Sequence, residues 1–194
     1  MMSKLYLPLS LQADTFSYSI FNTSWGWMGI VNSKRGLRRI ILPQSSYDNA
    51  HQIITTEVTV TKSSKNDTSR IIQKLKSYLQ GENVVFSDPL DLSPATQFQQ
   101  GIRQVICSIP YGETRSYSWV ANEIGKPGAR RAVGQVLAHN PIPIIIPCHR
   151  VIASDGSLHG FQRGLKMKQR LLSLEKHQLE TSIMVNKNST IFIL

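Results

Sequence analysis

The chain has 194 residues, of which 41% are hydrophobic, and it carries a formal net charge of +10. This length allows one large domain or two small ones, each with a buried core, while two cysteines without a Cys-x-x-Cys pair argue against a disulfide framework and a cysteine-rich zinc site. The basic excess favours an anionic partner such as nucleic acid or a membrane surface.

The N-terminal residues and the cysteine usage indicate a protein of the cell interior. Residues 1–11 lack a basic start followed by a long apolar core, and no run approaches the roughly 18 apolar residues of a membrane span. We therefore expect no membrane partner and a reducing compartment, which is cytoplasmic or, in a eukaryote, nuclear.

The first half of the chain has the pattern of a small sheet with helices. Short β-like runs at 16–21, 25–31 and 37–42 are broken by asparagine and glycine, which predicts antiparallel strands joined by turns. A short helix is predicted at 47–55, and the apolar spacing at 69–79 predicts an amphipathic helix.

A domain boundary is predicted near residue 92, because Asp88-Pro89 and Ser93-Pro94 are turn signals. Beyond it, the apolar stripe of residues 96–109 predicts a core helix. Cys107 lies beside that stripe with no basic neighbour, and we interpret it as a structural thiol.

Two short helices are then predicted around a glycine-containing turn. Ser116 is a good N-cap for a helix over 117–124. Gly128 opens a second helix, which ends before Asn140-Pro141 because a residue that precedes proline disfavours helix. Two such helices predict a helix-turn-helix, although an ordinary helical hairpin is the commoner structure.

The second helix has the features of a DNA-binding element. Arg130 and Arg131 stand at its start, and residues 98–175 contain ten Lys or Arg against four Asp or Glu, which favours DNA over an ordinary hairpin. Its apolar side is expected to face inward: Ala132, Val133, Val136 and Leu137. Its small residues would allow close approach to a narrow groove: Ala132, Gly134 and Ala138.

The chemically most informative stretch is an apolar, strand-like run at 142–146 that leads through Pro147 to Cys148 and His149. A free thiol has a pKa of about 8.5, so it needs a base or a positive field to react at neutral pH. His149 is the candidate base. Adjacent side chains of an extended segment point apart, so a bridging water or a turn would have to bring the two together. A buried structural thiol is the alternative interpretation.

The last part of the chain follows this stretch. Glycines within 154–164 predict a flexible loop, and residues 165–179 predict a helix. Residues 181–194 are expected to form a tail or an added strand.

The string Pro147-Cys148-His149-Arg150-Val151 resembles the active-site motif of the O6-alkylguanine-DNA alkyltransferases, which move an alkyl group from DNA onto their own cysteine. Further motifs of the family stand in the family's order between Phe98 and Glu175: Ile109-Pro110-Tyr111-Gly112-Glu113-Thr114, Ser116-Tyr117, Arg131-Ala132-Val133-Gly134, Asn140-Pro141, Lys168 and Leu171-Leu172. The resemblance implies an α+β fold with a ribonuclease-H-like sheet domain over 1–92, a mainly helical domain with the helix-turn-helix over 93–180, and a tail over 181–194.

The resemblance also implies the reaction. A methyl or other alkyl group would pass irreversibly, once per molecule, from O6 of guanine to Cys148, with O4 of thymine as an open second target. The partner would be double-stranded DNA, bound through the minor groove by a monomer with the alkylated base flipped out. No cofactor or metal is implied.

Residue roles follow by the same resemblance. His149 would remove the thiol proton through water, Glu175 would fix the imidazole tautomer, and Tyr117 would rotate the nucleotide and protonate the leaving guanine. Arg131 would fill the gap left in the base stack. DNA contacts would come from Ser116, Arg130, Arg131, Ala132, Gly134 and Leu137. The flipped base would be lined by Asn140, Val151, Gln162 and Arg163.

Arg163 departs from the family, which has glycine at this place. We expect its side chain either over the base pocket, where it would exclude bulky adducts, or on a DNA phosphate.

Two other function classes remain open. Alkyl-lesion sensors share the fold but replace the cysteine, so Cys148 argues against a pure binding module. A cysteine hydrolase would need an oxyanion site and a turnover pathway that the sequence does not show.

Overall fold

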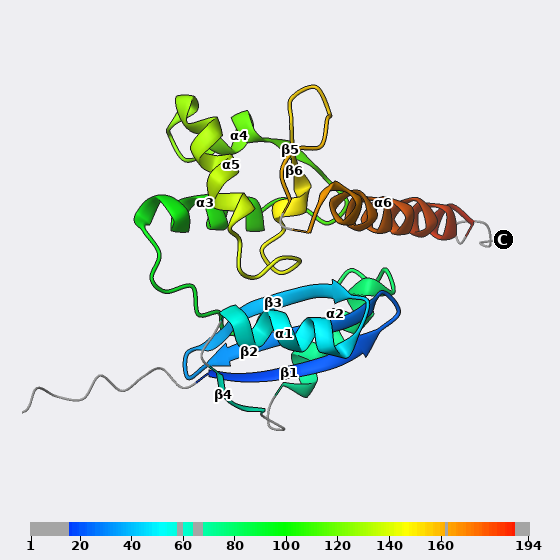
Figure 1. Ribbon diagram of the computed structural model, residues 1–194. Coiled ribbons are helices and arrows are strands. Elements are labelled where there is room, and N and C mark those ends of the chain that lie inside the picture. Colours follow the sequence, from blue (N-terminus) through cyan, green and yellow to red (C-terminus); the bar gives the residue numbers. More distant parts are fainter. Residues whose placement is uncertain (1–15, 58–59, 64–67, 162, 189–194) are drawn as a thin grey trace, which may run out of the picture.

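The sheet expected in the first half is present. The computed structural model describes residues 16–57, 60–63, 68–161 and 163–188 (Figure 1). Strands β1 (Phe16–Thr23), β2 (Gly26–Ser33) and β3 (Gly36–Gln44) form an antiparallel meander, and β4 (Val60–Ser63) adds parallel to β1, which gives the order β3-β2-β1-β4. The prediction of antiparallel strands joined by turns is confirmed.

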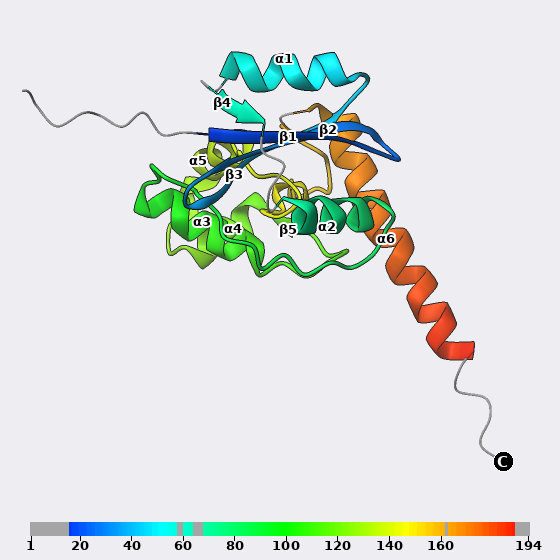
Figure 2. The ribbon, with the colours of Figure 1, turned by 90° about the horizontal axis from the view of Figure 1, so that it is seen from below.

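The two faces of this sheet are covered by different helices (Figure 2). Helix α1 (Tyr47–Glu57) lies on one face, where Ile54 packs against Val31 and Ile41. Helix α2 (Ser69–Leu79) lies on the other face, toward the C-terminal helices. Neighbouring strand residues point to opposite faces, so both sides of β2 contribute to a core.

The remaining elements belong to the helical part of the chain. They are α3 (Gln97–Cys107), β5 (Arg115–Ser116), α4 (Tyr117–Glu123), a 3-10 turn η1 (Pro127–Ala129), α5 (Arg130–Ala138), a second 3-10 turn η2 (Cys148–Arg150), β6 (Val151–Ile152) and α6 (Leu165–Asn188). Strands β5 and β6 pair in parallel. In the described part of the chain, no helix is long and apolar enough to cross a membrane.

Side-chain caps begin two of these helices where the sequence places cap residues. The Thr96 hydroxyl accepts from the N–H of Gln99, whose side chain accepts in return from the Thr96 N–H, so α3 begins with a capping box. The Ser116 hydroxyl accepts from the Trp119 N–H at 3.0 Å and begins α4. The predicted N-cap role of Ser116 is confirmed.

Helix α6 is longer than the sequence pattern predicts. It was expected to end at Leu179 but continues to Asn188, because no glycine or proline interrupts residues 165–188. Residues 181–188 therefore extend the helix, and the expectation of an added strand is wrong for them. Residues 189–194 lie outside the described residues.

The run at 142–146 is a turn and not the expected strand-like segment. Pro141, Pro143 and Pro147 provide no N–H for a strand ladder, and Ile144 adopts a left-handed φ of 75°. Ile142, Ile144 and Ile146 are nevertheless almost fully buried and Ile145 is partly buried, as expected for a short core segment.

The sheet and the helical part share one hydrophobic core, which fixes the turn that precedes Cys148. Met28 and Ile30 of β2, Ile102 of α3 and Leu171 of α6 belong to the same cluster. The Ile40 N–H of β3 also donates to a carbonyl oxygen of that turn, at Pro141, at 2.9 Å. The N-terminal sheet is therefore a direct support of the cysteine-bearing segment.

Candidate active site

Cys148 is the first residue of η2, and its side chain is only 5% exposed. Burial raises its pKa to about 11, although the amide of Asn140 and the positive charge of Lys168 act in the opposite direction. At neutral pH the group is therefore a thiol. A reaction at Cys148 requires a base that removes its proton.

Asn140 holds the turn and the sulfur together. Its Nδ2 donates to the Ile146 carbonyl at 2.8 Å and to Cys148 Sγ at 3.1 Å, while its Oδ1 accepts from the Ile142 N–H at 3.1 Å. The amide is buried, so these bonds fix the position of the sulfur.

His149 and Glu175 form the predicted pair. Nε2 of the fully buried imidazole lies 2.8 Å from Glu175 Oε1. Burial lowers the pKa of His149 below its usual 6.5, so the ring is neutral at pH 7. An Nε2–H that donates to the carboxylate leaves the lone pair on Nδ1, a buried atom that has no hydrogen-bond partner among the described residues.

Glu175 accepts more bonds than the sequence predicts. Besides His149, its carboxylate accepts from the Tyr78 hydroxyl at 2.6 Å, the Gly112 N–H at 2.9 Å and the Arg150 guanidinium at 3.0 Å. Burial alone would raise its pKa, but the hydrogen bond from His149 and the hydrogen bonds and positive charge of Arg150 lower it to about 2. The pair therefore contains an ionised carboxylate beside a neutral imidazole.

Lys168, for which the sequence predicts no role beyond its place in the motif, also belongs to this site. Its side chain is fully buried, and Nζ donates to the carbonyls of Val151 at 2.6 Å and His159 at 3.0 Å and to the Tyr117 hydroxyl at 3.4 Å. Burial lowers its pKa to about 8, so most of the group is charged at pH 7. The Val151 carbonyl, predicted to line a base, is thus engaged by this ammonium.

An open hollow of about 450 Å³ lies beside Tyr117. Its lining comes from α4, α5 and the segment before α6: Tyr117, Arg130, Arg131, Gly134, Gln135, Ala138, His159 and Gly160. A Cβ on Gly134 would lie 3.8 Å from the Tyr117 ring, so this glycine is a neighbour of the ring. The structure therefore brings Tyr117, Arg130, Arg131 and Gly134 to one surface.

The burial pattern of helix α5 differs from two expectations, one for Ala132 and one for Leu137. Val133 and Leu137, four residues apart, are its buried face, so Ala132 is exposed and does not face inward. Leu137 is only 5% exposed and packs in the main core. Its burial contradicts the predicted contact with DNA bases.

The loop residues also differ from expectation. The Arg163 guanidinium lies 3.4 Å from the Pro43 carbonyl of β3, so it faces the sheet, and it is not among the residues that line the hollow. Gln162 lies outside the described residues. Cys107, interpreted as structural, is exposed at the end of α3.

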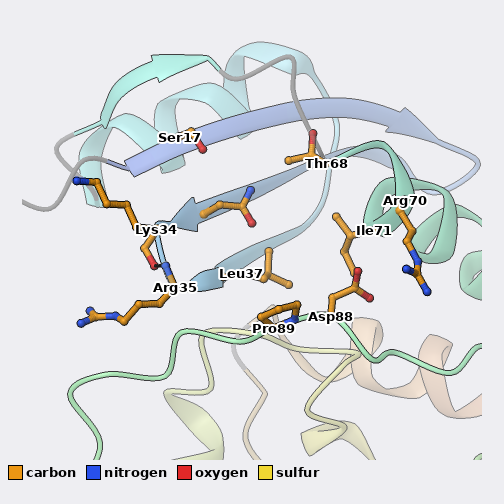
Figure 3. A pocket seen from close by; sticks show the side chains of 12 residues that line it. Ser17, Lys34, Arg35, Leu37, Thr68, Arg70, Ile71, Asp88 and Pro89 are labelled. Carbon is orange, nitrogen blue, oxygen red and sulfur yellow. Dashed lines mark hydrogen bonds between the residues drawn. The ribbon is translucent and has the colours of Figure 1, made fainter.

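A separate pocket of about 470 Å³ lies in the N-terminal half and contains none of the predicted site residues (Figure 3). Lys34 and Arg35 extend from one side of it, and Arg70 of α2 lies on the other. Across the described residues, no group of three or more His, Cys, Asp or Glu side chains is arranged to hold a metal ion.

Comparisons with known proteins agree with this site. Residues 97–177 match the family model described as the DNA-binding domain of 6-O-methylguanine DNA methyltransferase. A methylated-DNA–protein-cysteine methyltransferase of Mycobacterium leprae is 51% identical over 112 residues, which is 58% of this chain and 67% of the relative. The relative of the same name in Methanosarcina acetivorans is 39% identical over 75% of this chain and 83% of its own length.

Solved structures give the same result for most of the chain. The Mycobacterium tuberculosis protein OGT, crystallised in complex with DNA, superposes with a TM-score of 0.71 at 37% identity, covering 84% of this chain and 94% of the other. The alignments to several mycobacterial relatives span about two thirds of those proteins. Taken with the geometry around Cys148, these similarities show that the chain belongs to the methylated-DNA–protein-cysteine methyltransferase family.

Proposed function

We propose that this protein repairs DNA by direct reversal of damage, taking a methyl or other alkyl group from O6 of guanine onto Cys148 once per molecule. The observation that carries the proposal is a buried thiol adjacent in the chain to an imidazole whose Nε2 is occupied by Glu175 and whose Nδ1 is left as a base. A thiol whose pKa is raised by burial needs such a base.

The reaction is a displacement at carbon. His149 Nδ1 takes the thiol proton through a water molecule, and the Glu175 carboxylate stabilises the imidazolium that forms. The thiolate, beside the Lys168 charge, forms the new S–C bond as the C–O6 bond breaks and its electron pair moves to guanine. Tyr117, whose pKa is raised by burial and by Cys148, retains a proton that it can give to the leaving base.

The protein acts once because a thioether is a poor leaving group. None of the groups found around Cys148 in the described residues provides a nucleophile or reductant that would restore the thiol. The alkylated protein is therefore the end product.

DNA is bound through α4 and α5, which act as a helix-turn-helix in the minor groove with the alkylated base flipped toward the hollow. The exposed Arg130 and Arg131 and the exposed Ala132 support this arrangement, because cations and small residues allow close approach to phosphates and a narrow groove. Arg131 fills the gap left in the base stack.

The sheet domain is ribonuclease-H-like, and the protein acts as a monomer. Only three large apolar side chains are exposed among the described residues: Tyr47, Val85 and Leu165. This small number supports a monomer, since a stable dimer interface needs an extended apolar surface.

The test is intact-mass measurement after incubation with a duplex that contains O6-methylguanine. We expect one methyl group to be added and to map to Cys148, with no addition to Cys148→Ala and an unaltered addition to Cys107→Ala. An unchanged mass with tight binding to the lesion would instead indicate a sensor. Turnover of substrate with an unchanged mass would indicate a hydrolase.

A further inference from the structure

Tyr78 reaches the catalytic pair from the other half of the chain. It lies on α2, which covers the sheet, 71 residues before His149 and 97 before Glu175. Its hydroxyl donates to Glu175 Oε1 at 2.6 Å and lies 3.2 Å from His149 Nε2. The side chain is 1% exposed. No other residue of the described N-terminal half bonds to this carboxylate in the structure.

The hydroxyl and the imidazole share one carboxylate oxygen. Oε1 accepts from both Tyr78 and His149, and a bond from a hydroxyl to a carboxylate in a dry interior is short and strong. Such a bond neutralises part of the charge that faces the imidazole. Without it, the same carboxylate would stabilise a protonated His149 more strongly, and the pKa of His149 would rise.

Among the tyrosines near the imidazole in the described residues, Tyr78 alone donates to the carboxylate, while Arg150 also donates to Oε1, through Nη2 at 3.0 Å. The other charged or titratable groups near the pair are Arg150, Lys168, Cys148 and Tyr111. Tyr111 packs edge-on against Tyr78 with 6.1 Å between ring centroids, but its hydroxyl donates to the Gly81 carbonyl at 3.0 Å and not to the carboxylate. Burial also raises the pKa of Tyr78, so the hydroxyl remains a donor throughout the neutral range.

We propose that Tyr78 is a positioning residue for alkyl transfer: its hydroxyl fixes the carboxylate oxygen that orients His149 and keeps the imidazole neutral at a lower pH. The N-terminal half is thereby coupled to the chemistry by a direct bond and not only by packing. The inference rests on the proposed alkyl transfer, because the rate of that reaction is its first readout.

The experiment measures the second-order rate of methyl transfer from a duplex between pH 5 and 9. The proteins compared are the full-length wild type, Tyr78→Phe and the matched control Tyr111→Phe. Each of the two variants lacks one tyrosine hydroxyl. We expect the acid limb of Tyr78→Phe to move up by about one pH unit, so that its rate at the acid end falls about tenfold. Tyr111→Phe should follow the wild type, and DNA affinity should be equal for all three.

A second measurement does not depend on transfer. Nitrogen-15 NMR titration of His149 in the unreactive Cys148→Ala protein, with and without Tyr78→Phe, should show the same rise in its pKa. Unchanged titration and superimposed rate profiles, or an equal shift in Tyr111→Phe, would overturn the role of Tyr78. A wild type that transfers no methyl group while the NMR shift is present would overturn the proposed function alone.

Should Tyr78→Phe fail to fold, 3-fluorotyrosine in place of Tyr78 keeps the ring and makes the hydroxyl a stronger donor. The acid limb should then move to lower pH. A limb that does not move, or that moves upward, would overturn the proposal.

Discussion

Glu175→Gln tests the buried charge around which the active site is built. Burial alone would raise the pKa of Glu175, but His149 and Arg150 lower it from 4.5 to about 2. A pKa that is lower in the folded state adds stability above pH 4.5, and this stability is lost as pH falls through about 2. The pKa difference corresponds to about 3 kcal/mol at pH 7. We therefore expect glutamine to lower the free energy of unfolding by about 3 kcal/mol at pH 7 and by less than about half of that at pH 3.

The assay is urea unfolding followed by circular dichroism from pH 3 to 7 for wild type, Glu175→Gln and Glu113→Gln. The control carboxylate pairs with Arg115 at 2.7 Å but is 46% exposed, so its loss should cost at most about 1 kcal/mol. A difference between wild type and Glu175→Gln that stays constant from pH 7 to pH 3 would refute the reasoning, because a charge effect must fade as the carboxylate is protonated.

Three further substitutions separate chemistry, base extrusion and loop anchoring. Cys148→Ala should abolish transfer and keep the DNA dissociation constant within about twofold in gel-shift titrations, because phosphate contacts supply most non-specific affinity; a large loss of binding would contradict this. Arg131→Ala should slow repair in a duplex at least about tenfold but affect free O6-methylguanine little, since the free base needs no extrusion; equal losses would show another role. Arg163→Gly should leave the ratio of benzyl to methyl transfer rates within about twofold, because its guanidinium faces Pro43. A selective rise in the benzyl rate would show that Arg163 is a lid after all.

Local patterns were sufficient for most elements of the fold. Strands β1 to β3 could be predicted from short β-like runs and the turn residues between them, and helices α1 and α2 from the spacing of apolar residues. All of these patterns join residues that are close together in the sequence. The strand-like conformation predicted for residues 142–146 was wrong, because it was inferred from their apolar composition alone. Its prolines, which withhold N–H donors, determine the turn.

The centre of the site could also be predicted, because Cys148 and His149 are adjacent and the motif register adds Glu175. Tyr78 could not. On α2 it occupies an apolar position of an amphipathic helix, and its partner is 97 residues away, so nothing local distinguishes it from an ordinary core tyrosine. Arg163 is a similar case, since its contact with Pro43 spans 120 residues. Long-range contacts of this kind depend on how the two halves pack.

The most direct test of single-turnover transfer is the amount of repaired guanine formed when alkylated duplex is in large excess over the protein. The reaction should stop when one guanine has been repaired per protein molecule, with the alkyl group recovered on the peptide that contains Cys148. Repair that continues beyond one equivalent, or an alkyl group recovered on another residue, would contradict irreversible transfer to Cys148.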